Sequence, residues 1–327
     1  MTEWQCAPVL LHNFRRPAFT RNQILRLREA RPSRVFFSAD APREGNEREE
    51  RMCREVREAV KLIDWTSDVN TLFFERNLGP KYAYAKAISW FFDNVDEGII
   101  LEDDVVPTQS FFRFATELLE RYRHDERIGA ISGFNRYNLQ TDRQWSYHFT
   151  NHIDVWGWAS WKRAWKYYDV EMRPYYSNRK EVIARTGWTA RSKAEFLGGV
   201  EGVRERIRSW DYQWGLALLA HDLLIAAPKV KLTSNCGIHA ESGENTNGYD
   251  YDQTWIEDVQ ENLFDDELRH PQRIGIDRTR ITAEDKRKFG IVPRGFTWIG
   301  SRIPQSVPFC NWFGHRLERA FPRLFRI

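Results

Sequence analysis

The sequence of 327 residues is poor in cysteine and has no long apolar run. Its four cysteines are far apart and include no CxxC pair, which excludes a zinc knuckle and a disulfide framework. No stretch approaches the roughly 18 apolar residues of a membrane-spanning helix. Residues 1–14 lack the apolar core of a secretory signal. We therefore expect a protein of the reducing cytoplasm.

The sequence also lacks glycine-rich phosphate-binding loops and a large excess of charge of one sign. No GxGxxG follows the first apolar segment and GxxxxGK[ST] is absent, which excludes a dinucleotide fingerprint and a P-loop. The chain has 49 Lys and Arg against 46 Asp and Glu, a net charge of +3, with no basic tract of the kind that nucleic acid attracts. We expect no nucleic-acid partner, and the phosphates of any bound nucleotide need another source of positive charge.

What the sequence does contain is a regular alternation of short apolar runs and helical patterns, with 42% hydrophobic residues to form a core. The expected strands are 8–12, 35–38, 72–75, 98–101, 128–132 and 223–227. One expected helix begins at Thr20, whose hydroxyl caps it while Gln23 reaches back to the cap. Further helices are expected over 46–61, 82–92, 110–122 and 209–219. Alternating strands and helices predict an α/β fold, a mainly parallel sheet with helices on both faces. We expect one domain over 1–255 and an extension over 256–327.

The stretch GIILEDDVVP, residues 98–107, is the most informative part of the chain. An apolar run leads directly into Glu102, Asp103 and Asp104, and a second apolar run follows. Carboxylates next to an apolar core are costly unless a cation or hydrogen-bond donors accompany them. From the residues alone, a divalent metal site and a chance acidic triplet both remain open.

Ligands of parallel sheets bind outside the carboxyl ends of the strands. Two further strand ends carry polar residues, at 13–16 and at Asp40. Asp40 could accept a hydrogen bond from a nucleotide base, and Arg15 could stack on the nucleotide or pair with it. The alternatives are that Asp40 is a turn residue before Pro42, and that Arg15 or Arg16 lies in a solvated loop.

Four tryptophans occur within the ten residues 156–165. Trp156 and Trp158 flank a glycine, and tryptophans on such a loop can line a saccharide pocket because sugar C–H faces pack on aromatic rings. Trp161 and Trp165 are four residues apart on an expected helix, so we assign them to the core.

The segment SWDYQWGLALL, residues 209–219, predicts a helix with Asp211 in its first turn. An acid at this position is favoured by the helix dipole, and Ser209 could cap the helix, so a purely structural role is open. The alternative is a general base whose pKa is raised by its neighbours Trp210 and Trp214.

The segments that follow have less regular patterns. Residues 235–248 are rich in Gly, Asn, Ser and Thr and predict a loop over a ligand, in which His239 could donate to a phosphate or bind a metal. Residues 312–327 alternate arginines with apolar residues. This tail could rest on an anionic membrane or pack on the domain, and Pro322 would interrupt a continuous helix.

Seven segments resemble, in the same order, a family of bacterial nucleotide-diphospho-sugar transferases. The segments are PVLLHNFRRP, FFSADAPR, NLGPKYAYAKAISWFF, GIILEDDVVPTQSFFRF, WGWASWKRAW, SWDYQW and PKVKLTSNCG. The family has the GT-A fold, is labelled hemolytic-protein-like, and is distantly similar to the Golgi N-acetylglucosaminyltransferase that initiates complex N-glycans. The resemblance covers about residues 7–250 and implies a GT-A (Rossmann-like) fold.

The resemblance also implies roles for individual residues. Asp104 corresponds to the acid that binds manganese, so Mn²⁺ or Mg²⁺ is the implied cofactor. Asp211 corresponds to the catalytic base, and Arg15 and Asp40 to positions that bind uridine. A histidine near the nucleotide corresponds to Ala87, and we expect its neighbour Lys86 to contact the donor. The Golgi enzymes carry an N-terminal membrane anchor, and we expect none in this chain.

The predicted function is therefore an inverting, metal-dependent glycosyltransferase, with UDP-N-acetylglucosamine as the implied donor and a glycan or lipid-linked acceptor in surface polysaccharide synthesis. Glu102 and Asp103 would position ribose and donor sugar. The pocket for sugar or acceptor would include Trp156, Trp158, Trp210 and His239. We expect a cytoplasmic protein at the inner face of the membrane. The alternatives are a sugar nucleotidyltransferase and a non-enzymatic carbohydrate-binding protein.

Overall fold

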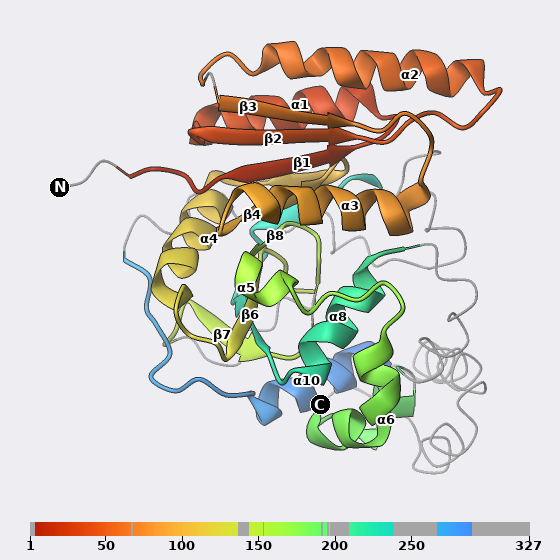
Figure 1. The fold of residues 1–327 in the computed structure, drawn as a ribbon. Helices are drawn as coiled ribbons and strands as arrows, with labels where there is room; N and C mark the ends of the chain where they lie inside the picture. Colours follow the sequence, from red (N-terminus) through yellow and green to blue (C-terminus); the bar gives the residue numbers. More distant parts are fainter. Residues whose placement is uncertain are drawn as a thin grey trace, which may run out of the picture. The chain divides into compact units, whose positions relative to one another are not determined.

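The computed structural model describes residues 4–289 except 67, 137–143, 153, 191, 195, 197–208 and 238–266 (Figure 1). The chain divides into two compact units. One comprises Met1–Pro174 and Ser209–Ile276, and the other Tyr175–Arg208 and Asp277–Ile327. The predicted boundary at residue 255 lies outside the described residues and stays a prediction.

The first unit contains an eight-stranded sheet in the order β3-β2-β1-β4-β8-β6-β9-β7. Its strands are β1 Val9–Asn13, β2 Arg34–Ala39, β3 Asp68–Phe73, β4 Glu97–Glu102, β6 Ile128–Ser132, β7 Tyr147–Thr150, β8 Trp158–Trp161 and β9 Leu224–Pro228. All run in one direction except β7 and β8. The predicted α/β fold with a mainly parallel sheet is therefore confirmed. A separate two-stranded sheet pairs β5 Val105–Pro107 with β10 Thr233–Asn235.

Helices cover both faces of the sheet (Figure 1). In the first unit they are α1 Pro17–Ala30, α2 Glu47–Glu58, α3 Gly79–Asn94, α4 Gln109–Tyr122, α5 Lys162–Trp165 and α8 Asp211–Ala220, with a 3₁₀ turn at Ala59–Leu62. Helix α10, Arg278–Phe289, belongs to the second unit, and α6, Arg173–Arg185, crosses from one unit into the other. None of the described helices is long and apolar enough to span a membrane.

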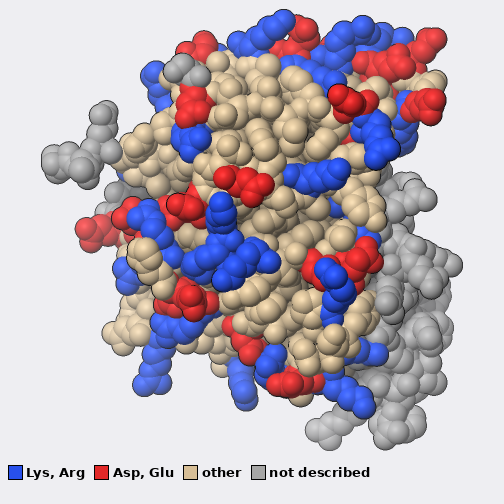
Figure 2. All heavy atoms as spheres, in the orientation of Figure 1, with Lys and Arg blue, Asp and Glu red and all other residues tan. Residues whose placement is uncertain are grey.

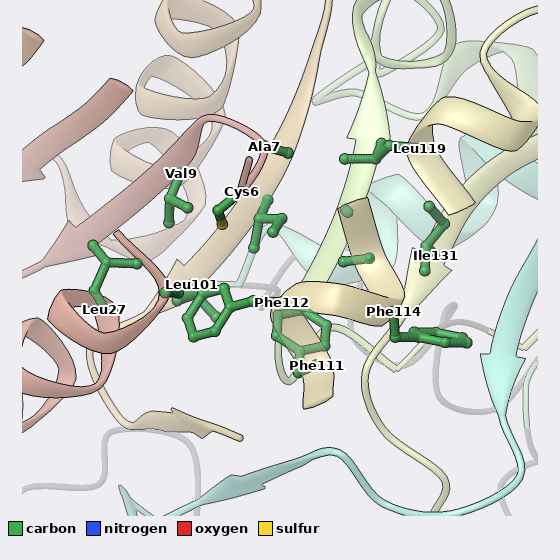
Figure 3. Close-up of a cluster of buried hydrophobic side chains, with 14 of the residues drawn as sticks. Cys6, Ala7, Val9, Leu27, Leu101, Phe111, Phe112, Phe114, Leu119 and Ile131 are labelled. Atoms are coloured by element: carbon green, nitrogen blue, oxygen red, sulfur yellow. The ribbon is translucent and has the colours of Figure 1, made fainter. Parts of the chain in front are cut away.

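Alternate residues of the central strands face opposite layers, because successive side chains of a strand point to opposite faces. On β1, Val9 and Leu11 belong to the cluster under α1, α2 and α4, whereas Leu10 belongs to the cluster under α3, α5 and α8. Figure 3 shows the first cluster, in which Leu27 and Phe112 meet the side chains of the sheet. Each fully buried side chain of this kind contributes about 1.5–3 kcal/mol.

Tryptophans dominate the second cluster, and the position of Trp158 shows that the predicted pocket role of this residue was wrong. Residues 158–161 form a strand, so Trp158 and Trp161 point to opposite faces and are 0% and 1% exposed. The ring of Trp158 stacks on Trp210 at 5.5 Å and lies 5.7 Å from Trp214. Trp158 therefore belongs to the core and does not line a saccharide pocket. The core assignment of Trp161 and Trp165 is confirmed, but Trp161 lies on a strand and not on the expected helix.

Two predicted helix starts are also wrong. Helix α1 begins at Pro17, whose fixed φ suits the first helical position, and the hydroxyl of Thr20 donates to Asn13 Oδ1 and to the carbonyl of Arg16. Helix α8 begins at Asp211 without a side-chain cap, and Ser209 Oγ is buried with no hydrogen bond. The short strands β5, β7 and β10 have no clear sequence signal and were not predicted.

Charged side chains of both signs are mixed on the surface. On the face drawn in Figure 2, basic and acidic residues lie next to one another, most densely along the edge where α2 runs. Exposed ion pairs such as Arg21 with Glu55, 3.5 Å apart, contribute little to stability. This face therefore carries no broad patch of positive or negative charge alone.

Replacing Gly98 with Ala should lower the free energy of unfolding. A Cβ at Gly98 would lie 2.7 Å from the carbonyl oxygen of Pro8 and still closer to the ring of Phe91, and a backbone atom in the centre of the sheet cannot move aside. Overpacking of this kind costs about 1–3 kcal/mol.

Urea unfolding followed by tryptophan fluorescence measures this loss. The control is Gly275→Ala, because a Cβ there would meet nothing within 4 Å. Its unfolding free energy should change by less than about 0.5 kcal/mol. Equal midpoints for the two variants would contradict the tight packing at Gly98.

Candidate functional site

The carboxyl ends of β1 and β4 meet where the order of the sheet reverses. From β1 the chain continues to β2 on one side, while β4 pairs with β1 on the other side. Helix α1 follows β1 on one face and α3 leads to β4 on the opposite face. Such a reversal is the usual ligand site of an open parallel sheet. The acidic residues 102–104 lie directly at this point.

Hydrogen bonds from α1 hold the acidic turn in place. Glu102 ends β4, and Asp103 and Asp104 form a turn before β5. The amide of Gln23, only 2% exposed, donates to the carbonyls of Glu102 and Val105 at 2.6 and 3.1 Å. Gln23 had been expected to cap α1, and it supports the turn instead.

The short sheet of β5 and β10 supports the turn from the other side. Asn235 Nδ2 donates to Asp104 Oδ1 at 3.2 Å, and the backbone N–H of Cys236 donates to the carbonyl of Asp104 at 2.9 Å. Gly237 approaches Asp104 so closely that a Cβ would clash with its carboxylate. The carboxylate of Asp104 is therefore held at a defined position.

Arg16 contacts both aspartates of the turn. Its Nη1 donates to Asp103 Oδ1 at 2.6 Å and to Asp104 Oδ2 at 2.9 Å. The side chains of Arg16, Asp103 and Asp104 are 14%, 6% and 16% exposed. The expectation of a solvated loop is thus wrong for Arg16, because the loop after β1 lies beside the turn after β4.

Negative charge is in excess at this site. Burial raises the pKa of Glu102 well above its ordinary value, and the charges of Asp104, Asp211 and Asp103 raise it further. Burial and the charge of Asp103 also raise the pKa of Asp104 to about 6, although Arg16 opposes this. Among the interactions of the described residues, Arg16 is the arginine that contacts this turn, and the raised pKa values of Glu102 and Asp104 show that the carboxylates repel one another there.

Tyr84 of α3 connects the acidic turn with α8. Its hydroxyl donates a hydrogen bond to Glu102, and its ring stacks on Trp210 at 5.5 Å and meets the ring of His12 edge-on at 4.1 Å. His12 Nδ1 lies 2.8 Å from Ser38 Oγ, and burial lowers the pKa of His12 to about 3, so its ring is neutral. Nothing in the sequence pattern pointed to Tyr84.

Asp211 is a second, separate carboxylate at this edge. It is the first residue of α8, where the backbone N–H groups of Asp211 and Tyr212 favour its ionised form. Burial outweighs these hydrogen bonds and raises the pKa of Asp211 above its ordinary value. The charge of Asp211 also acts on Glu102, so the two carboxylates belong to one electrostatic environment.

Asp40 is engaged in the turn that starts α3. Its carboxylate accepts from the backbone N–H groups of Ala41, Leu78 and Gly79 at 2.9–3.0 Å, and from Asn77 Nδ2 at 3.2 Å. The side chain is 3% exposed. The carboxylate is therefore bound mainly at the start of α3 and not only in the turn before Pro42 that the sequence suggested, and a contact of Asp40 with a nucleotide stays a prediction.

The other predicted nucleotide residues have different surroundings. Arg15 Nη1 forms an ion pair with the buried Glu49 at the start of α2, so Arg15 is not solvated either. Lys86 is exposed on α3. Neither residue contacts the acidic turn through a described interaction, and their contact with a nucleotide stays a prediction.

The remaining pocket residues are only partly accessible. Trp156 is half-buried, its ring 4.6 Å from that of Phe134. Trp210 is 2% exposed, so it supports Tyr84 and does not line an open pocket. His239 and the tail at 312–327 lie outside the described residues, and their roles stay predictions.

The acidic turn fits a hard divalent cation that binds together with phosphate oxygens, and the described residues do not fit a metal ion held by protein side chains alone. In the described part of the chain, no three His, Cys, Asp or Glu side chains are placed to hold a metal. A hard cation that is bound through one or two carboxylates and completed by phosphate oxygens needs no such cage. The excess negative charge and the partly exposed carboxylate of Asp104 fit this arrangement.

Comparison with known proteins yields distant structural similarity. No protein-family model and no curated protein matches the chain. Mannosyltransferase PcManGT from Pyrobaculum calidifontis, solved with GDP-Man and Mn²⁺, is 12% identical with a TM-score of 0.36, over 66% of this chain and 70% of that one. HddC from Yersinia pseudotuberculosis is 9% identical with a TM-score of 0.29, over 48% and 77%. The glycosyltransferase GlyE of Streptococcus pneumoniae TIGR4 is 9% identical with a TM-score of 0.32, over 68% and 45%. Similarity this low carries no conclusion about function.

Replacing Asp211 with Asn should raise the free energy of unfolding near pH 7.5. Because the pKa of Asp211 is higher in the folded chain than the ordinary 3.8, ionisation of the partly buried carboxylate destabilises the folded state at neutral pH. Below the ordinary pKa the carboxyl is protonated in both states, so the gain from Asn should disappear as the pH falls.

Chemical unfolding at several pH values between about 4 and 8 measures this difference. The control is Glu44→Gln, which removes one negative charge from an exposed loop and should give no comparable gain. A variant Asp211→Asn that is no more stable than wild type at neutral pH would contradict the destabilising burial.

Proposed function

We propose that the chain is a glycosyltransferase that moves a sugar from a nucleotide-diphosphate donor to a hydroxyl group of an acceptor. One observation carries the proposal. An acidic turn of repelling carboxylates and a separate, partly buried carboxylate of raised pKa, Asp211, share the edge where the sheet order reverses. The first can take a cation with a diphosphate, and the second can take a proton.

The acidic turn is the donor side of this site. Asp104, with Asp103 beside it, would hold Mn²⁺ or Mg²⁺ together with the donor diphosphate. A divalent cation at this position would neutralise the charge that develops on the leaving nucleotide. Glu102 would accept hydrogen bonds from hydroxyl groups of the donor, while the hydroxyl of Tyr84 orients its carboxylate.

Asp211 is the acceptor side. Its carboxylate takes the proton of the acceptor hydroxyl while the acceptor oxygen bonds to the anomeric carbon of the donor. The bond from that carbon to the diphosphate oxygen breaks on the opposite face, which inverts the configuration. A raised pKa makes Asp211 a stronger base than an exposed aspartate. The inverting course, UDP and N-acetylglucosamine follow from the sequence resemblance.

The alternative functions find less support. A nucleotidyltransferase ordinarily needs a glycine-rich loop after the first strand, and residues 13–16 contain no glycine, while Arg16 is paired with the acidic turn. For a carbohydrate-binding protein, two of the tryptophans expected to line the sugar pocket, Trp158 and Trp210, are buried and cannot pack on a sugar.

Calorimetric titration of UDP with and without Mn²⁺ tests the donor side. We expect wild-type protein to bind UDP only when Mn²⁺ is present, and Asp104→Asn to lose this binding, because the variant removes the charge while keeping the side-chain size. The control is Asp93→Asn, at an exposed position of α3, which should bind UDP as wild type does. Wild-type protein that binds no UDP under any condition would overturn the proposed function.

The acceptor side is tested by turnover. Asp211→Asn should bind UDP with Mn²⁺ as wild type does, whereas kcat should fall about 10²–10⁴-fold, the usual contribution of a general base. Release of UDP from UDP-sugars measures this rate. In wild type the rate should fall as the pH drops through the raised pKa of Asp211, because protonation removes the base. Transfer by Asp211→Asn at the wild-type rate would show that another group is the base.

A further inference from the structure

Arg16 occupies the face of the acidic turn that a cation would need. A single nitrogen, Nη1, contacts one oxygen of each aspartate, Asp103 Oδ1 at 2.6 Å and Asp104 Oδ2 at 2.9 Å. The other oxygen of Asp104, Oδ1, accepts from Asn235. Both oxygens of Asp104 therefore have a donor in this state, and a metal ion at Asp104 would stand next to a guanidinium of like charge.

The backbone at Arg16 is anchored by contacts that do not involve its guanidinium. The carbonyl of Arg16 accepts from the backbone N–H and the hydroxyl of Thr20, both at 3.0 Å. Its guanidinium lies 6.0 Å from the ring of Phe19, a loose contact. These backbone contacts are the same whether the guanidinium binds a carboxylate or another anion.

We propose, on the basis of the function proposed above, that Arg16 is a positioning residue that exchanges partners when the donor binds. Without donor it holds Asp103 and Asp104 and competes with the metal. When the donor diphosphate binds, the guanidinium of Arg16 leaves Asp104 and pairs with the phosphate oxygens, and the carboxylate of Asp104 would then hold a divalent cation. Arginine suits this exchange because its planar group pairs with carboxylate and phosphate alike.

The exchange determines the order of binding. A metal ion alone must displace Arg16 from Asp104 without supplying a phosphate for its guanidinium, so the free protein binds metal weakly. A metal ion with a nucleoside diphosphate replaces the lost ion pairs with new ones. The site therefore takes metal and donor together, and it releases the metal with the nucleotide after transfer.

Two titrations of Arg16→Gln test this proposal, with opposite expected changes. Mn²⁺ alone, followed by the loss of the free-ion electron paramagnetic resonance signal, should bind the variant roughly tenfold tighter or more, since one competing charge-assisted interaction is gone. UDP at saturating Mn²⁺ should bind the variant about tenfold more weakly, since a phosphate loses its arginine. The control is Arg28→Gln, which changes an exposed arginine of α1 that pairs with Asp64 and should alter neither affinity.

A merely structural arginine would give a different result. If Arg16 only supports the turn, its removal weakens both titrations, and shifts in the same direction, or a missing shift in either one, overturn the exchange. Wild-type protein that binds no UDP at any Mn²⁺ concentration overturns the proposed function itself. Wild-type protein that binds UDP, with equal Mn²⁺ affinity in variant and wild type, overturns only the role of Arg16.

If the loss of the Arg16 charge beside Asp103 and Asp104 destabilises the variant Arg16→Gln, thermal unfolding tests the proposal instead. Mn²⁺ should then raise the Tm of the variant more than that of wild type, because the ion replaces the missing charge. An equal or smaller rise, or a variant that remains unfolded in excess Mn²⁺, overturns the competition between Arg16 and metal.

Discussion

Three carboxylates at the end of one buried strand are the constraint to which the rest of this site responds. Such groups repel one another and lose solvation, so neighbouring elements have to compensate. Gln23 and Cys236 bind the backbone of the turn, Tyr84 binds Glu102, and Arg16 pairs with both aspartates. These four residues come from the helix after β1, the residue directly after β10, the helix before β4 and the loop after β1, so the turn gathers distant parts of the chain.

Much of the fold and part of the site followed from the sequence. Continuous apolar runs mark strands that are buried on both faces, which is why β1, β2, β4 and β6 were found within one or two residues. The acidic turn was found because charge follows directly on such a run. Trp158 was misassigned because a glycine between tryptophans suggests a loop, whereas residues 158–161 pair antiparallel between β4 and β6.

The contacts that determine the chemistry were not predictable from local pattern. Whether Arg16 reaches Asp103 depends on the pairing of β1 with β4, which aligns His12 with Glu102. Tyr84 looks like any aromatic residue of a packed helix until α3 lies across the sheet and α8 brings Trp210 to its ring. For Asp40 the local pattern was misleading in the opposite way. An acid at a strand end suggests a ligand contact, but its carboxylate accepts hydrogen bonds from the backbone at the start of α3.

The pairing of β5 with β10 has a consequence for the synthesis of the chain. It joins Asp104 to Asn235, which are 131 residues apart, so the acidic turn gains its last support only after most of the first unit has emerged from the ribosome. Helix α8 with Asp211 also comes late. A nascent chain that ends near residue 200 already has the first strands but neither of these parts. Premature termination or slow translation in this region therefore yields a sheet with an unsupported anionic edge, a target for chaperones and proteases.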